Sequence, residues 1–347
     1  MSGEIDILAL GMASPLGLSS RATIAALRAG FAAHEDVDEV EDLAGDSVSA
    51  CRLEELDTSA SRVERAHFFA AHALAETLSW RRWMTPPATF LVGPERPQAS
   101  NVDSGALWAR LRSSFEGVPL PPSATVIPHG RAGLFHALAL ARDQLFAGAV
   151  DLALVGGADS LVTTDELQQL ARDNILLGKS NPDGLIPGEG AAFFLLARRG
   201  EPGALATIET VALGQELEPR SMGGPPRAAG LTRLFAQLRG TGAARAEVVV
   251  SALAYQRWWA REFSHAYLRN AALMPEPLVA VAPSSGLGDL GAAAGGVALA
   301  TAVWEFHPLV ARRGARVLDR ALVYGCTDSG TLGACLLRSP RTHGEIS

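Results

Sequence analysis

Reactive side chains are few in this sequence, and the first group stands at the start of a long apolar segment. His129 and Arg131 flank Gly130, where a short β-branched run ends and an apolar helix is predicted to begin. Free backbone amides at a helix N-terminus favour negative charge, so His129 and Arg131 could form an anion site. The alternative is that Arg131 fills and seals a pocket through a salt bridge, since no glycine loop typical of phosphate binding is present.

Two further places carry candidate residues. Cys326 and Asp328 stand in the glycine-containing turn 324–330, and Asp289 stands in a glycine-rich segment. A thiol acts as a nucleophile only when it is deprotonated, and the sequence assigns no base to Cys326; a buried, inert thiol is the other interpretation. Asp289, Asp328 and Tyr255 could converge as a polar cluster, or they could satisfy backbone groups of nearby glycines.

The remaining cysteines, histidines and tryptophans give weaker signals. Cys51, Cys326 and Cys335 lack paired or metal-like spacing, which is typical of a reducing compartment, and the histidines lack ligand spacing as well. The sequence therefore predicts no metal site and no cofactor. Trp258 and Trp259 could form an aromatic surface for a partner, or one could pack in the core while the other is partly exposed.

Apolar runs and helical segments alternate along the chain and must position these residues. In the first part we expect strands at 5–10, 89–93, 124–127, 152–155 and 191–196, with helices at 19–28, 61–78 and 132–146. In the second part we expect strands at 206–213, 247–253, 278–282, 321–324 and 331–338, with helices at 231–238, 257–273 and 291–304. The segment 34–60 is polar and receives no element.

The order strand, apolar helix, strand occurs once in each part. The helices at 132–146 and 291–304 are apolar almost all round, which is typical of helices at the centre of a protein. This pattern predicts an α/β fold made of two related halves, residues 1–202 and 203–347, packed around central buried helices.

Composition limits the classes of function. The chain has 347 residues, 48% of them hydrophobic and 19% charged, which indicates a globular protein and not a disordered one. Its formal charge of -7 comes without any basic run, so we expect no nucleic-acid partner. Neither a signal peptide nor an apolar run long enough to span a membrane is visible, and we expect a cytoplasmic protein.

Four glycine-rich segments in fixed order resemble the β-ketoacyl synthases, which have the thiolase fold. They are residues 11–17 (GMASPLG), 155–160 (VGGADS, with Gly156 and Gly157), 187–192 (PGEGAA, with Gly188 and Gly190) and 288–295 (GDLGAAAG). The resemblance extends from Ile5 to about Arg338. It implies a thiolase-like fold with the two halves in a layered αβαβα arrangement, and in that fold Glu189 is expected to be a buried structural carboxylate that bonds backbone amides.

The resemblance also implies a catalytic cysteine and two histidines that this sequence lacks. The cysteine belongs at the N-terminus of the first central helix, which corresponds to Arg131 within about one residue; neither Gly130 nor Arg131 can form an acyl-enzyme. The first histidine belongs just after the strand at 247–253, where Tyr255 stands, and the second is replaced by Asp289. The family's lysine is missing from Pro283–Gly286 as well.

We therefore expect a protein related to fatty acid or polyketide synthases that has lost condensing activity. The first hypothesis is an assembly subunit similar to a chain-length factor, forming a homodimer or a heterodimer with an active ketosynthase through Ile127 and residues 152–161, with acyl carrier protein as a further partner. A second is an adaptor or chaperone-like scaffold outside lipid synthesis, for example for a secretion system, that binds a protein cargo. A third is a divergent acyltransferase that uses Cys326.

Overall fold

A ten-stranded sheet organises the described part of the chain. The computed structural model describes residues 3–57, 59–95, 103–254, 256–307 and 317–340. Its elements up to residue 198 are β1 (Ile5–Ala13), α1 (Ser20–Arg28), β2 (His34–Glu41), β3 (Ser47–Cys51), α2 (Arg62–Trp80), β4 (Ala88–Val92), α3 (Ser104–Ser114), β5 (Thr125–Ile127), the 3-10 turn η2 (Gly130–Ala132), α4 (Gly133–Phe146), β6 (Leu152–Ser160), α5 (Thr164–Arg172) and β7 (Glu189–Arg198).

The later elements repeat this succession. They are β8 (Ala206–Gln215), η3 (Arg220–Met222), α6 (Ala229–Gly240), β9 (Val248–Ser251), α7 (Arg257–Arg269), β10 (Ala280–Val281), α8 (Ser284–Leu287), η4 (Gly291–Ala293), α9 (Ala294–Glu305), β11 (Arg320–Cys326) and β12 (Thr331–Arg338). The sheet order is β10-β9-β11-β12-β8-β1-β7-β6-β4-β5. Read outward from the β8–β1 junction, both halves have the same order, which confirms two related α/β halves. The boundary between residues 202 and 203 stays a proposal.

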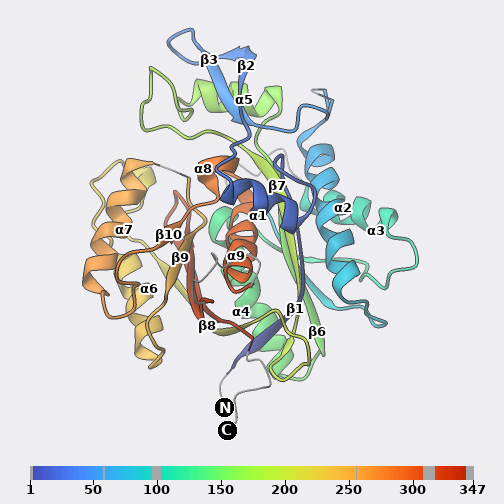
Figure 1. Ribbon diagram of the computed structural model, residues 1–347. Coiled ribbons are helices and arrows are strands. Elements are labelled where there is room, and N and C mark those ends of the chain that lie inside the picture. The colour runs from blue at the N-terminus through green and yellow to red at the C-terminus, as the bar shows by residue number, and fades with distance from the viewer. Residues whose placement is uncertain (1–2, 58, 96–102, 255, 308–316, 341–347) are drawn as a thin grey trace.

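The two halves fold over a shared middle layer. Helix α4 contacts β4 and β6 on one side and β8 and β12 on the other, and α9 contacts β9 and β11 as well as β1 and β7. On the outside, α2 and α3 cover the first half and α6 and α7 cover the second, as Figure 1 shows from right to left. This is the predicted αβαβα arrangement.

Small side chains let the central helices lie close to the sheets. Every residue of α9 from Ala294 to Trp304 is buried, and alanine and glycine make up most of this run. Helix α2 is different, because only one of its faces is apolar. Its N-terminus is fixed by a capping box in which Ser61 and Glu64 bond each other's backbone amides. The arginines of its buried face enter the site described below.

A small cap covers one end of the sheet and was not expected from the sequence. Strands β2 and β3 form a separate hairpin, and α5 packs against β2 (Figure 1). Only Val37 and Val40 of β2 are buried, so the hairpin has too few apolar residues for its periodicity to be recognised. Helices α3 and α5 were not predicted either; they are short, and each buries only a few residues.

The sheet order corrects one expectation about the dimer contact. Strand β6 was expected to contribute residues 152–161 to an interface, but it lies between β4 and β7 and is buried from Ala153 to Ser160. A strand paired on both sides has no free edge to offer. Strand β5, which contains Ile127, is at the edge of the sheet and leaves Thr125 and Val126 exposed.

Candidate functional site

The candidate site begins where β5 turns into the first central helix. Gly130 has φ +44°, and a Cβ atom at this position would lie 3.2 Å from Cβ of Glu95. Both the backbone conformation and the space therefore favour glycine. The turn places Arg131 at the N-terminus of α4, where the resemblance to ketosynthases puts a cysteine. The Arg131 side chain is 6% exposed.

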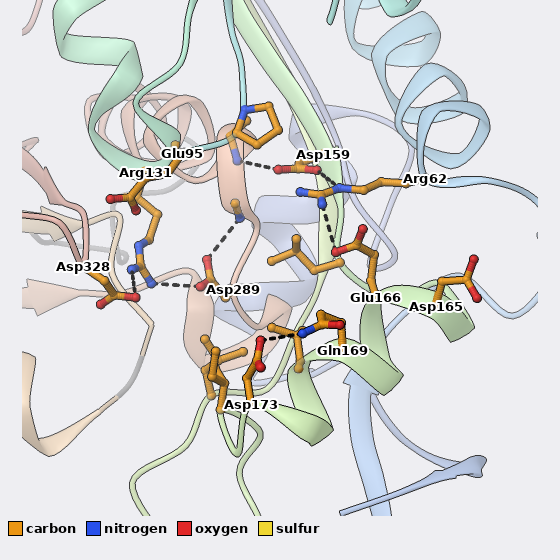
Figure 2. A pocket seen from close by; sticks show the side chains of 18 of the residues that line it. Arg62, Glu95, Arg131, Asp159, Asp165, Glu166, Gln169, Asp173, Asp289 and Asp328 are labelled. Atoms are coloured by element: carbon orange, nitrogen blue, oxygen red, sulfur yellow. Dashed lines mark hydrogen bonds and ion pairs between the residues drawn. The ribbon is translucent and has the colours of Figure 1, made fainter. Parts of the chain in front are cut away.

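Two aspartates hold the Arg131 guanidinium. Nη1 lies 2.9 Å from Oδ2 of Asp289, and Nη2 lies 3.0 Å from Oδ2 of Asp328 (Figure 2). The guanidinium also lies over the Trp259 ring, 5.8 Å from its centroid. Asp289 accepts a further bond from the Gly291 amide, and each of its oxygens thereby has a donor. The structure thus brings Arg131, Asp289 and Asp328 together.

Electrostatics keeps Arg131 and Asp328 ionised. Burial by itself lowers the pKa of Arg131, but the carboxylates of Asp289, Asp328 and Glu95 outweigh it and raise the pKa above its ordinary value. The pKa of Asp328 is lowered: burial acts to raise it, while Arg131 and Arg220, whose Nη1 is 3.2 Å away, act more strongly to lower it. An arginine held in this way cannot act as a nucleophile or as a base.

A cavity of about 500 Å³ opens in front of this cluster. Gly130, Arg131, Asp289 and Asp328 line it, whereas His129 and Cys326 do not. Its wall also includes Arg62, Asp159 and residues of α5, as Figure 2 shows. The carboxylates in its lining are Glu95, Asp159, Asp165, Glu166, Asp173, Asp289 and Asp328. Tyr255, the third member of the polar cluster considered from the sequence, lies outside the described residues.

His129 points to a different neighbour. Its ring lies 4.6 Å, centroid to centroid, from that of His136 on α4. Burial and the nearby His129 lower the pKa of His136 to about 4, so the His136 ring is neutral at pH 7. Neither residue of the anion site considered from the sequence is available to an anion in this geometry. The charge of Arg131 is neutralised by aspartates, and the His129 ring packs against His136.

Cys326 is enclosed at the end of β11. Its side chain is fully buried, and burial raises the pKa of the thiol well above its ordinary value, with Glu262 adding to the effect and Arg131 opposing it. Cys335 is buried in the same way, and burial raises the pKa of Cys51 to about 12. A thiol in such surroundings is protonated at neutral pH and weakly nucleophilic.

The glycine-rich motifs join the two halves beside the site. Gly156 and Gly157 lie in β6, and a Cβ atom on Gly157 would meet the Ala292 carbonyl oxygen of η4 at 2.6 Å. Gly188 and Gly190 flank Glu189 at the start of β7. Because Gly157 has no side chain, the backbone at the start of the second central helix can lie directly on the first half.

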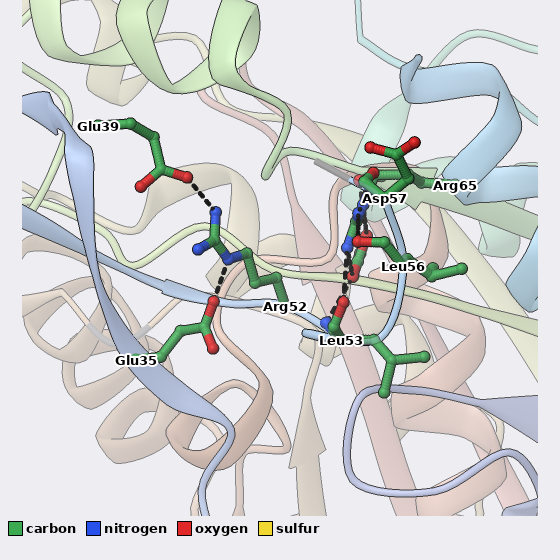
Figure 3. A network of polar contacts seen from close by, with 9 residues as sticks. Glu35, Glu39, Arg52, Leu53, Leu56, Asp57 and Arg65 are labelled. Atoms are coloured by element: carbon green, nitrogen blue, oxygen red, sulfur yellow. Dashed lines mark hydrogen bonds and ion pairs between the residues drawn. The ribbon is translucent and has the colours of Figure 1, made fainter. Parts of the chain in front are cut away.

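Glu189 is fully buried and forms the centre of a second ion-pair network. It accepts bonds from Arg65 at 2.7 and 2.8 Å, from the Leu53 amide at 2.8 Å and from the Ser160 hydroxyl at 2.8 Å. Arg65 in turn donates to backbone carbonyls of residues 53, 56 and 57, which Figure 3 shows together with the Arg52 ion pairs of the cap. Glu189 thus bonds one backbone amide and the Ser160 hydroxyl, and chiefly the guanidinium of Arg65.

One part of the site was missed by sequence reasoning. Arg62 of α2, 5% exposed, pairs with Asp159 at 2.9 Å and with Glu166 of α5 at 2.9 Å. The available signal was the spacing of Arg62 and Arg65, which places two cations on the apolar face of α2. A buried arginine requires a carboxylate partner, but the sequence does not say which one.

The arrangement around the first central helix agrees with comparisons to known proteins. Residues 132–201, which include α4, β6, α5 and β7, match the family model "Beta-ketoacyl synthase, N-terminal domain". A solved structure described as the ishigamide ketosynthase/chain length factor superposes with a TM-score of 0.76 at 17% identity, covering 97% of this chain and 99% of that one. This chain has the thiolase-like fold of ketosynthases.

Other solved structures support the same fold. A type II PKS acyl-carrier protein in complex with its ketosynthase gives a TM-score of 0.75 at 12% identity, with 97% of this chain and 99% of that chain covered. The ketosynthase from module 6 of the bacillaene synthase of Bacillus subtilis 168 gives 0.74 at 14% identity, covering 98% and 72%. No curated protein matches the sequence. No helix within the described ranges is long and apolar enough to cross a membrane.

Proposed function

We propose that this protein is a ketosynthase-like subunit that does not condense acyl groups and acts by binding a partner. The observation that carries the proposal is Arg131 at the N-terminus of α4, buried and fixed between Asp289 and Asp328. Acyl transfer to an enzyme needs a nucleophile that faces the substrate and that a base activates. The side chain at this position is a cation with no lone pair available for attack.

Among partner functions, a role similar to that of a chain-length factor is the first choice. Its support is the match of nearly the whole chain to a ketosynthase/chain length factor structure, with 97% of one and 99% of the other covered. In this function the protein pairs with itself or with an active ketosynthase. The exposed edge strand β5 offers unpaired backbone groups for such a contact, with Val126 40% exposed.

The adaptor function is a second candidate because of the acidic cavity. The phosphopantetheine arm of an acyl carrier protein is attached through a phosphodiester, which is an anion, and the carboxylates of the cavity repel anions. A protein cargo with basic groups fits the same lining. The third hypothesis, acyl transfer by Cys326, has the least support, since the thiol is fully buried and does not line the cavity.

Acyl loading tests the central proposal. The purified protein is incubated with acyl-CoA and with acyl-loaded carrier protein, beside an active ketosynthase as a positive control, and intact mass is measured. We expect no mass increase in this chain. A covalent acyl adduct would overturn the proposal, and if the Cys326→Ala variant lost that adduct, the acyltransferase hypothesis would replace it. Co-expression with a ketosynthase then separates the two partner functions, because only a chain-length-factor-like subunit should co-purify with it and raise its activity.

A further inference from the structure

The cavity in front of Arg131 is lined by aliphatic and by acidic side chains. Leu161, Leu170 and Ile175 line it and are each only partly buried, so their aliphatic groups stay accessible from the cavity. Carboxylates stand among them, on α5 as well as around Arg131. A ligand that suits this lining has a hydrocarbon stem and a positively charged end. Figure 2 shows the α5 segment across this space from the Arg131 cluster, with Glu166 bonded to Arg62 and Asp173 bonded to Gln169.

Charge balance in the cavity favours a cation. Seven carboxylates and three guanidiniums line it, a formal surplus of four negative charges, one of which is offset by Arg220 beside Asp328. Arg131 and Arg62 are buried and already paired with aspartate and glutamate partners. If either arginine side chain turned toward an anionic ligand, it would leave a buried carboxylate without its partner, which costs free energy. Arg172, at the rim, donates to Gln169.

The hollow continues along the outside of the cap. A second depression of about 340 Å³, bounded by Asp38, Glu39 and Glu41 of β2, shares Arg172 with the first. Asp38 and Glu41 are exposed, and the Glu39 side chain remains 40% exposed although it pairs with Arg52. Two adjoining acidic hollows can accommodate a stretch of peptide with more than one basic side chain, whereas a single small cation would fill only one of them.

We propose that the cavity binds a lysine or arginine side chain from a basic segment of a partner protein, with the stem on the aliphatic side chains and the charged end among the carboxylates. This inference rests on the proposed function and names the class of its partner. Two exposed carboxylates stand at the cavity wall: Asp165, at the first turn of α5, and Asp173, at its C-terminal end, which also accepts a bond from Gln169 at 2.9 Å.

Fluorescence anisotropy with a labelled peptide of alternating lysine and serine tests the inference on the full chain. The matched ligand is the same peptide with N-acetylated lysines, which keeps the stems and removes the charges. The test variant is Asp165→Asn with Asp173→Asn. The control variant is Asp143→Asn with Asp151→Asn, which removes the same net charge from exposed positions near the far ends of α4 and β6.

We expect the lysine peptide to bind, and acetylation or the test variant to weaken binding by about fivefold, as two exposed ion pairs allow. The control variant should change the dissociation constant by less than twofold, and unchanged melting temperatures exclude misfolding. Absent binding, binding of the acetylated peptide at equal strength, or equal losses in both variants would overturn the inference. Binding of spermidine in calorimetry without binding of the peptide would overturn its assignment to a protein segment. Since none of these measurements involves acyl loading, their failure is distinguishable from failure of the proposed function.

Discussion

Replacing Glu262 with glutamine should make the stability of this protein less dependent on pH. Glu262 of α7 and Glu216 are 2% and 4% exposed, and they lie together at the N-terminus of α6. Glu262 accepts a bond from the Ala228 amide at 2.9 Å, and Glu216 accepts one from Gly230 at 2.6 Å. Burial and the neighbouring Glu216 raise the pKa of Glu262 to about 7, so a proton is held between the two carboxyl groups near neutral pH.

The direction of the pH effect follows from this raised pKa. Between the ordinary glutamate pKa of 4.5 and about 7, the folded protein holds a proton that the unfolded chain releases. This contribution to the free energy of unfolding is complete below pH 4.5 and is lost as the pH rises through 7. Its size is about 3 kcal/mol from the change in pKa, which for a chain of 347 residues shifts the melting temperature by roughly 4 °C.

Glutamine at residue 262 keeps an oxygen for the Ala228 amide and donates to Glu216 at every pH. We therefore expect the melting temperature of Glu262→Gln, relative to the unmodified protein, to rise by roughly 4 °C between pH 5 and pH 8. Scanning calorimetry across this range measures it. Glu218→Gln is the control, because the Glu218 side chain is half exposed. Parallel curves for Glu262→Gln and the unmodified protein would refute the reasoning.

Two further predictions concern the Arg131 cluster and the sheet edge. Arg131→Met leaves Asp289 buried without its partner and should lower the free energy of unfolding, measured by calorimetry, by about 3 kcal/mol. Adding Asp289→Asn should restore at least half of this loss. If the double variant recovers nothing, the loss does not come from the ion pair. Val126→Lys on edge strand β5 should turn the proposed dimer into a monomer in light scattering. The control is Leu268→Lys at an exposed position of α7, which should leave the dimer intact. A dimer that survives Val126→Lys would exclude β5 as the contact.

The sequence allowed good predictions where apolar residues repeat regularly. The strand expected at 331–338 is β12, and the helix expected at 61–78 is α2, which differs by two residues at its end. The hairpin β2–β3 was missed because β2 buries only two residues and is mostly acidic, and β3 has only five residues. A strand that owes its place to a few contacts with a neighbouring helix has little local signal of its own.

The site was predictable in position but not in its contacts. The start of the first central helix could be located from the turn at Gly130, and the absence of a thiol there is visible in the sequence. The pairing of Arg131 with both Asp289 and Asp328 joins segments that are far apart along the chain, and nothing local marks these residues as partners. The same holds for Arg62 and Asp159, and it explains why the role of α5 in the cavity wall was missed.

The shared middle layer has a consequence for how the protein is made. Helix α4 is complete early in synthesis, but two of the strands that cover it, β8 and β12, belong to the second half. Until residues 331–338 emerge from the ribosome, the side of this apolar helix that faces the second half is only partly covered. Newly made chains that stall in the second half should therefore be prone to aggregation and dependent on chaperones, even though the first half already contains five strands of its own sheet.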